Sequence, residues 1–328
     1  MNFKIRSFSR KNTFILLFIC LSGFLLSCDS ESNKQAVNLN DQLSESELKT
    51  LQEQNQKLQS AIYYFGFDLR SSPQEDSRQY LPFLRYLEKS TGYQFELRFT
   101  PEKSSIIDQL GQGKVHFAAL GAVSYIKANE KYGVSSIARG LNLHDKASYQ
   151  SMIVVNKSSK IKTVNDLKNK RFAFGDINST QGHLIPRIIL QQHSINLTDL
   201  KLYEYTGSHQ NCAEAVITLK ADACGMQDTM ARLMAKENKL KILYESQYYP
   251  SSGVAANQDL PPEVVDRVRQ ALLSFDPQGK HKEGLYHWLK TEMPNGFIRV
   301  EEKDYFELRK WLIDFEMMES DSPSDLVQ

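Results

Sequence analysis

A short polar segment interrupts an apolar run in the middle of the chain, within the sequence FAFGDINSTQGHLIPRIIL at residues 172–190. It places two adjacent hydroxyls, Ser179 and Thr180, and then Gln181 and Gly182, where a strand pattern gives way to a helix pattern. The first turn of a helix has unpaired backbone N–H groups and a partial positive charge, so this segment is suited to binding an anion. Gly182 would let the backbone approach such a ligand closely. From these residues alone, simple N-capping by one hydroxyl is the favoured interpretation.

One helix N-terminus is too weak to bind an anion by itself. Its dipole contributes at most about 2 kcal/mol, whereas micromolar affinity requires about 8 kcal/mol in addition to the cost of removing water from the ligand. Several charge-assisted hydrogen bonds of roughly 1.5–3 kcal/mol each must therefore converge on the ligand. We expect these donors to come from more than one part of the fold.

Strand and helix patterns alternate along the rest of the chain. Strand patterns at 62–67 and 94–99 flank an amphipathic helix pattern, and the same alternation recurs between residues 149 and 245. This alternation predicts an α/β protein with parallel sheets whose faces are covered by helices. Ligands of such sheets bind at the carboxyl ends of the strands. The chain has 328 residues, a formal charge of +1 and 24% charged residues, which indicates a globular protein long enough for two domains and gives no sign of nucleic-acid binding.

The N-terminal residues predict export and lipid attachment. An apolar run at 14–26 is too short to span a bilayer of about 30 Å comfortably, and it follows basic residues, as in an export signal. These basic residues are Lys4, Arg6, Arg10 and Lys11. The run ends in LLSC, which resembles the lipobox of bacterial lipoproteins, in which the cysteine (here Cys28) is acylated and becomes the first residue. We therefore expect a signal peptide at 1–27 and an envelope protein anchored to a membrane outside the cytoplasm, on the periplasmic side of the inner membrane in a Gram-negative host. The alternative is a short membrane anchor with an incidental cysteine.

The segment 28–60 is polar and has no aromatic residue, so it is expected to be a flexible tether, partly helical near 44–58. Beyond Cys20 and Cys28, two cysteines remain in the folded body, Cys212 and Cys224. An exported pair can form a disulfide, but both lie in apolar surroundings where free cysteine behaves as a small hydrophobe, and free thiols are the favoured interpretation. No further cysteine or nearby histidine completes a metal site, so neither a metal nor a cofactor is expected.

Four segments carry a resemblance to a known family. They are GQGKVHFAALGAVSYIKA, YQSMIVVNKSSKIKTVNDLKNKRFAFGDINSTQGHLIP, TGSHQNCAEAVITLKADACGMQD and GFIRVEEKDYFELRKWL. In this order they resemble the phosphonate/phosphite/phosphate-binding subunits of ABC importers, over residues 62–312. The resemblance implies a two-lobed periplasmic-binding-protein fold of type II, with the ligand in the interlobe cleft. Lobe 1 would comprise 61–155 and 251–328 and lobe 2 residues 156–250, with two crossovers, near 155–157 and 246–253.

The resemblance also implies site residues, each with a simpler alternative. Ser208 and His209 match the family's Ser-His pair at a helix start, although His209 could be a surface histidine. Tyr125 matches the cleft tyrosine of the other lobe, and its alternative is a core aromatic residue. Asp228 matches the cleft carboxylate, which would select ligands by accepting a hydrogen bond or pairing with an ammonium group, and its alternative is a helix N-cap. With the resemblance, Ser179, Thr180, Gln181 and Gly182 are expected to bind the anion.

One histidine and one arginine lie near these candidates, and two positions depart from the family pattern. His183 is expected to be a solvated neighbour of the site, and Arg70 follows the first strand where an arginine fork would suit a phosphoryl oxygen, although a surface position is favoured. Gln181 stands where the family has a small hydroxyl residue and His116 where it has an acidic one, so the particular phosphorus oxyanion stays open.

The expected function is that of a monomeric, lipid-anchored solute-binding protein that closes on its ligand and docks on an ABC permease with its ATPase. A ligand sensor of the same fold that signals to a membrane receptor kinase is the alternative. A hydrolase using Ser208, His209 and Asp228 is disfavoured because no catalytic motif such as G-x-S-x-G supports it, so no catalytic residues are expected.

Overall fold

The computed structural model describes residues 44–101 and 104–318. The expected signal peptide and Cys28 lie outside the described residues. The chain separates into a first unit of residues 1–49 and a second unit, residues 50–328, that holds both sheets. Helix α1 (Glu45–Ser60) covers the part of the expected tether that was predicted to be helical. Among the described residues, no helix is both long enough and apolar enough to cross a bilayer.

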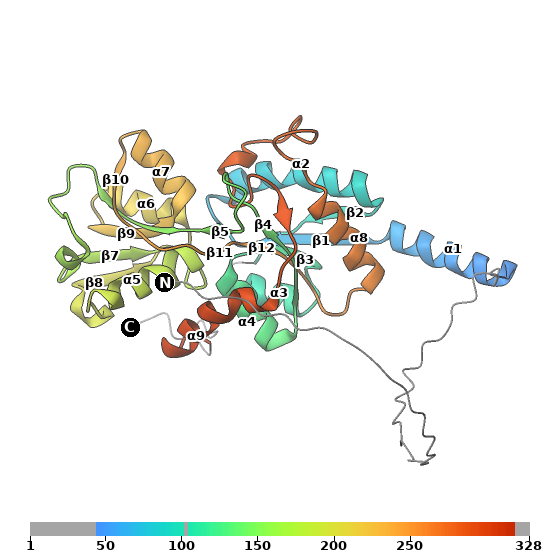
Figure 1. The fold of residues 1–328 in the computed structure, drawn as a ribbon, viewed down its shortest axis with the longest axis horizontal. Coiled ribbons are helices and arrows are strands. Elements are labelled where there is room, and N and C mark those ends of the chain that lie inside the picture. The colour runs from blue at the N-terminus through green and yellow to red at the C-terminus, as the bar shows by residue number, and fades with distance from the viewer. Residues whose placement is uncertain (1–43, 102–103, 319–328) are drawn as a thin grey trace, which may run out of the picture. The chain divides into compact units, whose positions relative to one another are not determined.

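One lobe is built on a six-stranded sheet in the order β13-β4-β12-β3-β1-β2 (Figure 1). Its strands are β1 (Ile62–Phe67), β2 (Gln94–Leu97), β3 (Phe117–Leu120), β4 (Ser135–Gly140), β12 (Gly253–Ala256) and β13 (Phe297–Ile298). β1 pairs in parallel with both β2 and β3, whereas β12 runs antiparallel between β3 and β4. The carboxyl ends of β1 and β3 therefore meet at one edge, as α/β architecture requires for a ligand site.

The other lobe is built on a five-stranded sheet in the order β10-β6-β9-β7-β8. Its strands are β6 (Ser151–Asn156), β7 (Arg171–Phe174), β8 (Leu202–Tyr205), β9 (Ala223–Gln227) and β10 (Leu240–Glu245). β7 pairs in parallel with β8 and β9, so the turns that follow β7 and β8 leave the same edge of the sheet. These turns contain the polar segments that the sequence marked as candidates for ligand binding.

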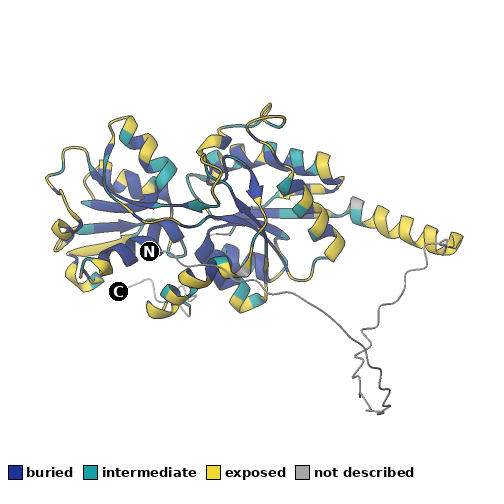
Figure 2. Cartoon of the chain, in the orientation of Figure 1, coloured by how far each residue is buried: buried dark blue, intermediate teal, exposed yellow. Residues whose placement is uncertain are grey.

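Helices pack on the sheets, and the central strands are buried between them, whereas edge strands such as β8 are partly exposed (Figure 2). On the first lobe these are α2 (Pro73–Thr91), α3 (Ile106–Gly111), α4 (Ala122–Tyr132), α8 (Pro262–Leu273), η4 (Trp288–Lys290), η5 (Glu302–Tyr305) and α9 (Phe306–Asp314). On the second they are η1 (Val164–Leu167), the π-helical turn η2 (Thr180–Leu184), α5 (Ile185–Gln192), η3 (Leu197–Asp199), α6 (His209–Ile217) and α7 (Asp228–Lys236). Local sequence explains α2 well: the Ser72 hydroxyl caps its start, Pro73 occupies its first turn, and Gly92 ends it in the left-handed region at φ 76°.

The chain passes between the sheets at β5 (Ser148–Tyr149) and again near β11 (Tyr249–Pro250), and these two strands pair antiparallel. The expected first crossing near 155–157 is corrected by this topology. β6 pairs along its length with β9 and β10, so residues 151–155 belong to the five-stranded sheet rather than to lobe 1. The strand pattern at 149–156 is continuous in sequence, and only the pairing partners show where it divides.

Cys212 in α6 and Cys224 in β9 form a disulfide. The interpretation as free thiols is therefore wrong. Both cysteines are fully buried in one apolar cluster, which explains the apolar sequence context, but this burial also brings the two sulfur atoms together because α6 packs on β9.

Candidate functional site

A cleft of about 1480 Å³ is lined by residues of both lobes. The first lobe contributes the residues that follow β1, the turn between β3 and α4, and two positions far along the chain, Ser252 and Glu292. The second lobe contributes the turns after β7 and β8. Thr180 and Ser208 thus face one shared cavity, as convergence of the two helix starts requires. Among the described residues, no cluster of side chains could hold a metal ion.

Arg70 is the central cation of this cleft. Its side chain is only 12% exposed, and Nη1 donates to Oε1 of the buried Glu292 at 2.8 Å. Its other two nitrogens, Nε and Nη2, are buried without a hydrogen-bond partner. The surface position that sequence analysis favoured is therefore incorrect. Since a buried donor that lacks a partner is costly, two such atoms on one guanidinium in a cleft indicate a place for a ligand oxygen.

Asp68 lies two residues before Arg70 and lines the same cleft. Its Oδ2 accepts from the Gly121 N–H at 2.7 Å, and its Oδ1 accepts from the Ser124 hydroxyl at 3.0 Å. Burial raises the pKa of Asp68 to about 6, although the positive charge of Arg70 opposes this shift. Asp68 therefore occupies the N-terminus of α4 and becomes neutral at mildly acidic pH.

Burial also raises the pKa of Glu292, against the opposing effect of Arg70. Glu292 accepts a short hydrogen bond from the Ser252 hydroxyl. Arg70 thus lies near two carboxylates, Asp68 and Glu292, whose ionisation is disfavoured by burial, and Asp176 is a further carboxylate of this kind in the lining. Ionised carboxylates would repel an anionic ligand, so their neutral forms favour its binding.

The turn after β7 uses its two hydroxyls differently. The Ser179 hydroxyl accepts from the Gly182 N–H at 2.9 Å and so caps the helix, while the Thr180 hydroxyl accepts from the N–H of Val123 in the other lobe at 2.9 Å. A hydroxyl that accepts such a bond still has its own hydrogen to donate. Both residues line the cleft, so N-capping and ligand binding are compatible roles at this turn.

The turn after β8 repeats this arrangement. The Ser208 hydroxyl caps α6 by accepting from the Asn211 N–H at 3.1 Å. His209 is 3% exposed, and its Nδ1 is buried without a partner. Burial, assisted by the charge of Arg70, lowers the pKa of His209 to about 3, so the ring is neutral and has one N–H to donate. The structure does not place His209 on the surface.

Gly182 does not line the cleft. A Cβ at this position would lie 3.1 Å from both the Gly175 Cα and the His209 Cε1, and 2.9 Å from the Ser179 hydroxyl. The glycine is therefore required for close packing inside the turn, which presses the turn against His209, rather than for approach to a ligand.

Gln181 and Asp228 form a network behind the cleft. Gln181 lines the cleft, but its Nε2 donates to the Gln150 carbonyl at 2.7 Å and to Asp228 Oδ1 at 3.2 Å. Asp228 also accepts from the backbone N–H groups of Gln150 and Thr229. Asp228 is not among the residues that line the cleft, so it is neither the expected cleft carboxylate nor the N-cap of α7, which is Gln227. Gln150 lies between β5 and β6, so this network fixes the site turn to the first crossing.

Tyr125 does not line the cleft either. It is 3% exposed, and its ring packs on Tyr305 with a centroid distance of 4.6 Å. The simpler alternative of a core aromatic residue describes it. Tyr149, at the first crossing, lines the cleft instead, and its hydroxyl is buried without a hydrogen-bond partner. Burial and the nearby Glu292 raise the pKa of Tyr149, so the phenol keeps its proton and can donate it in a hydrogen bond.

His183 is buried rather than solvated. Its Nδ1 lies 2.7 Å from the Ile177 carbonyl, which can only accept, so Nδ1 carries the hydrogen and Nε2 accepts from the Tyr205 hydroxyl at 3.0 Å. Burial lowers the pKa of His183 to about 3. With both nitrogens occupied, His183 supports the turn and has no free donor for a ligand.

Sequence reasoning missed several residues of the cleft. Asp68 could have been found, because it follows the first strand at the same edge that drew attention to Arg70. Glu292 and Ser252 carry no local signal, since only the folding of distant segments brings them beside Arg70. Tyr149 was assigned to a continuous strand, where nothing distinguishes it from a core residue.

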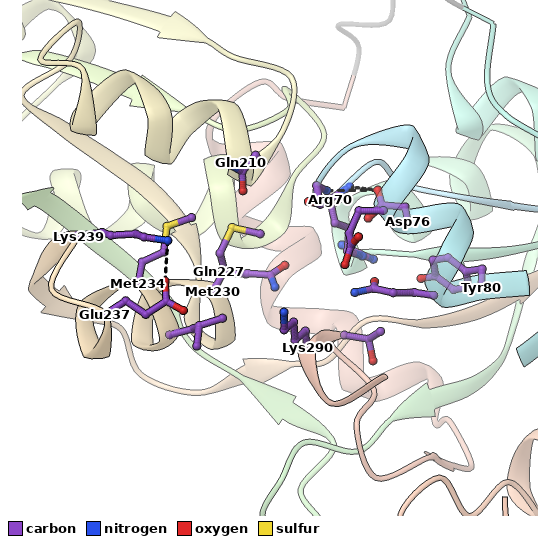
Figure 3. A pocket seen from close by; sticks show the side chains of 15 residues that line it. Arg70, Asp76, Tyr80, Gln210, Gln227, Met230, Met234, Glu237, Lys239 and Lys290 are labelled. Atoms are coloured by element: carbon purple, nitrogen blue, oxygen red, sulfur yellow. Dashed lines mark hydrogen bonds and ion pairs between the residues drawn. The ribbon is translucent and has the colours of Figure 1, made fainter. Parts of the chain in front are cut away.

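Arg70 also lines a second, smaller pocket of about 310 Å³. Figure 3 shows Arg70, Asp76 and Tyr80 on one side of this pocket and residues such as Met230 and Lys239 on the other. The Asp76 carboxylate accepts from the Arg70 backbone N–H at 2.9 Å. Arg70 thus lies between the cleft and this smaller pocket and lines both.

Two α/β lobes joined by two crossing segments, with a polar cleft between them, define a two-lobed solute-binding protein. Residues 65–305 match the model of a family described as "ABC transporter, phosphonate, periplasmic substrate-binding protein", and the chain belongs to this family. The family's members are extracytoplasmic binding components of transporters, not enzymes.

Curated relatives agree with this family assignment, and a solved structure has a similar fold. The chain is 27% identical over 228 residues, 66% of this chain and 67% of the relative, to the phosphonates-binding periplasmic protein of Escherichia coli. It is 26% identical to the phosphate-import protein PhnD of Mycolicibacterium smegmatis, over 74% of this chain and 83% of that protein. The solved structure of PhnD1 from Prochlorococcus marinus in complex with methylphosphonate has a similar fold, with a TM-score of 0.70 at 19% identity, covering 78% of this chain and 98% of that one.

Proposed function

We propose that the cleft binds a small phosphorus oxyanion, namely a phosphonate, phosphite or phosphate, and that the protein delivers it as a monomer to an ABC permease and its ATPase. The observation that carries this proposal is a set of buried polar atoms without partners on residues that line one cleft: Arg70 Nε and Nη2, His209 Nδ1 and the Tyr149 hydroxyl. Each of these atoms left unsatisfied costs about 1–3 kcal/mol. An oxyanion with three or more oxygens would satisfy several of them at once.

The ligand class follows from charge and from the relatives. The guanidinium fork of Arg70 matches two oxygens of a tetrahedral oxyanion, and hydroxyls at two helix N-termini add donors of the kind that anions prefer. The relatives named above are a phosphonates-binding protein and a phosphate-import protein. We assign phosphorus oxyanions as a class to this chain because the same donors serve all three of them.

Binding is proposed to close the two lobes on the ligand. Donors from both lobes line the cleft, and the lobes already touch through the Thr180–Val123 bond and through Lys127 Nζ, which donates to Asn178 at 2.8 Å. The short antiparallel pair β5–β11 is the segment about which the lobes would rotate. Transport requires no covalent step in this protein, since closure and docking suffice.

Replacing Thr180 or His209 with alanine is expected to weaken methylphosphonate binding at least tenfold each. Each change removes a hydrogen-bond donor from the cleft, and the loss of one such bond to a charged ligand corresponds to roughly 1.5–3 kcal/mol. Isothermal titration calorimetry on the full-length protein in detergent measures this effect. Thr180→Ser, which keeps the hydroxyl, should bind within a few-fold of wild type, and Thr218→Ala on the outer end of α6 is the matched control. Unchanged affinity in both alanine variants would remove the two turns from the site.

The protein is further proposed to be anchored through lipid on Cys28. Metabolic labelling with palmitate should mark the wild-type chain and the Cys20→Ser control but not Cys28→Ser, because only the cysteine of the LLSC motif would be acylated. Labelling is preferable to membrane fractionation, since an uncleaved signal would retain the Cys28→Ser variant at the membrane without any lipid. An unlabelled wild-type chain, or a labelled Cys28→Ser chain, would contradict this anchor.

A further inference from the structure

A second arginine, Arg187 of α5, lines the same cleft. Its guanidinium lies over the ring of Phe315, 4.4 Å from the centroid. Within residues 44–101 and 104–318, no hydrogen bond or ion pair of the Arg187 guanidinium is found. Burial lowers the pKa of Arg187, and only Tyr205 and Tyr203 oppose the shift, so no carboxylate of the described residues lies near enough to balance its charge.

This isolation contrasts with the other arginines of the second lobe. Arg171 pairs with Asp222 at 2.8 Å, and Arg232 pairs with Glu245 at 2.9 Å. Arg187 is only partly buried, and none of its nitrogens is fully buried. A partly buried guanidinium gains from an anion beside it, and a ligand could supply that anion. Because Phe315 stacks on the flat face of Arg187, the N–H groups in the plane of the guanidinium are not used by this contact.

The size of the cleft also favours a ligand larger than a single oxyanion group. Methylphosphonate has five heavy atoms and would fill about 150 Å³ if each took the roughly 30 Å³ of a water molecule. The cleft holds about 1480 Å³ although the two lobes are already in contact at Thr180 and Val123. Besides the donors around Arg70, the lining includes Arg187 and Phe315. A single oxyanion group would leave most of this space to water.

We propose that Arg187, stacked on Phe315, forms a second anion subsite, and that the preferred ligand is a phosphonate that carries a second anionic group, such as a carboxylate, on an organic chain. This inference rests on the proposed function, since Arg70 and the two helix starts bind the phosphonate group while Arg187 binds the other end. The second group provides the counter-ion that Arg187 lacks among residues 44–101 and 104–318.

A series of ligands of increasing chain length, each with and without a second anionic group, tests the subsite. Phosphonoacetate, 3-phosphonopropionate and 4-phosphonobutyrate are compared by calorimetry with ethyl-, propyl- and butylphosphonate, using the full-length protein in detergent. We expect at least one carboxylate ligand to bind ten times more tightly than its alkyl partner of equal length. Methylenebisphosphonate shows whether a second phosphonate serves better than a carboxylate. Either preference supports the subsite.

Variants then assign the preference to one residue. Arg187→Gln should abolish the advantage of the second anion while changing methylphosphonate affinity less than twofold, and Arg187→Lys should keep part of it. Arg98→Ala is the matched control, because Arg98 also stacks on an aromatic ring, Tyr64, but does not line the cleft. The melting temperature of each variant shows whether it is folded, and Phe315→Leu tests the subsite without changing any charge.

The outcomes separate this inference from the proposed function. If alkylphosphonates bind and no second anionic group improves affinity, or if the improvement survives in Arg187→Gln, the subsite is wrong and the proposed function stands. If no phosphonate, phosphite or phosphate binds at all, the proposed function is itself wrong.

Discussion

Replacing Arg70 with alanine is expected to lower the affinity for methylphosphonate at least a hundredfold. The change removes two buried donors, Nε and Nη2, that have no partner in the protein. Two charge-assisted hydrogen bonds of roughly 1.5–3 kcal/mol each correspond to a factor of about 10² to 10⁴, at about 1.4 kcal/mol per tenfold change. No other change to a single residue of the cleft should weaken binding as much, because Arg70 is the cation at its centre.

The same substitution leaves Glu292, the ion-pair partner of Arg70, without its counter-ion. Glu292 is 6% exposed, and without Arg70 its carboxyl group either carries a buried, uncompensated charge, which costs about 3–5 kcal/mol of folding free energy, or takes up a proton. The double variant Arg70→Ala with Glu292→Gln removes that charge and is expected to remain folded but unable to bind. Glu292→Gln alone should bind as tightly as wild type or more tightly, since it removes a negative charge near the ligand. Near-normal affinity of the folded double variant, measured by calorimetry, would show that Arg70 is not part of the anion site.

Replacing Asp68 with asparagine is expected to stabilise the protein at pH 8 and to leave its stability at pH 4 almost unchanged. The folded state raises the pKa of Asp68 from 3.8 to about 6, so the folded protein holds a proton that the unfolded chain has lost between these values. The stability contributed by this proton is fully present below about pH 4 and is lost as the pH rises through about 6. At about 1.4 kcal/mol per pKa unit, the difference is up to about 3 kcal/mol.

Asparagine can occupy the site of Asp68 without losing either contact. Its oxygen can accept from the Gly121 N–H, and its amide can donate to the Ser124 hydroxyl, which serves as donor or acceptor. Urea unfolding between pH 4 and pH 8 measures the effect, with the exposed Glu96→Gln as control. Asp68→Asn should also strengthen methylphosphonate binding at pH 8, because it removes a negative charge from the cleft. Stability curves of Asp68→Asn and wild type that stay parallel across this range would mean that Asp68 titrates normally.

Features that depend on local sequence could be predicted, and they include most of the fold. The alternation of strand and helix patterns gave the α/β class, and serine residues marked the helix starts at Ser179 and Ser208, both of which cap as expected. Arg70 was expected after the first strand, but its burial beside Glu292 was not. A local pattern predicts where a backbone turn lies, because helix caps and strand ends are determined by a few neighbouring residues.

Features that depend on long-range packing could not be predicted in this way. Tyr125 matched a motif, yet its ring turns toward Tyr305, which is 180 residues further along the chain. Asp228 matched equally well, but Gln150 and Gln181 hold its carboxylate away from the cleft. The direction of a side chain is decided by the partners that folding provides, so a motif alone assigns a position and leaves the contacts undetermined.

The most direct test is a crystal structure of the protein with methylphosphonate. The account predicts the phosphonate oxygens within about 2.7–3.2 Å of Arg70 from one lobe and of Thr180, Ser208 or His209 from the other. A ligand held by only one lobe, or bound away from Arg70, would contradict it.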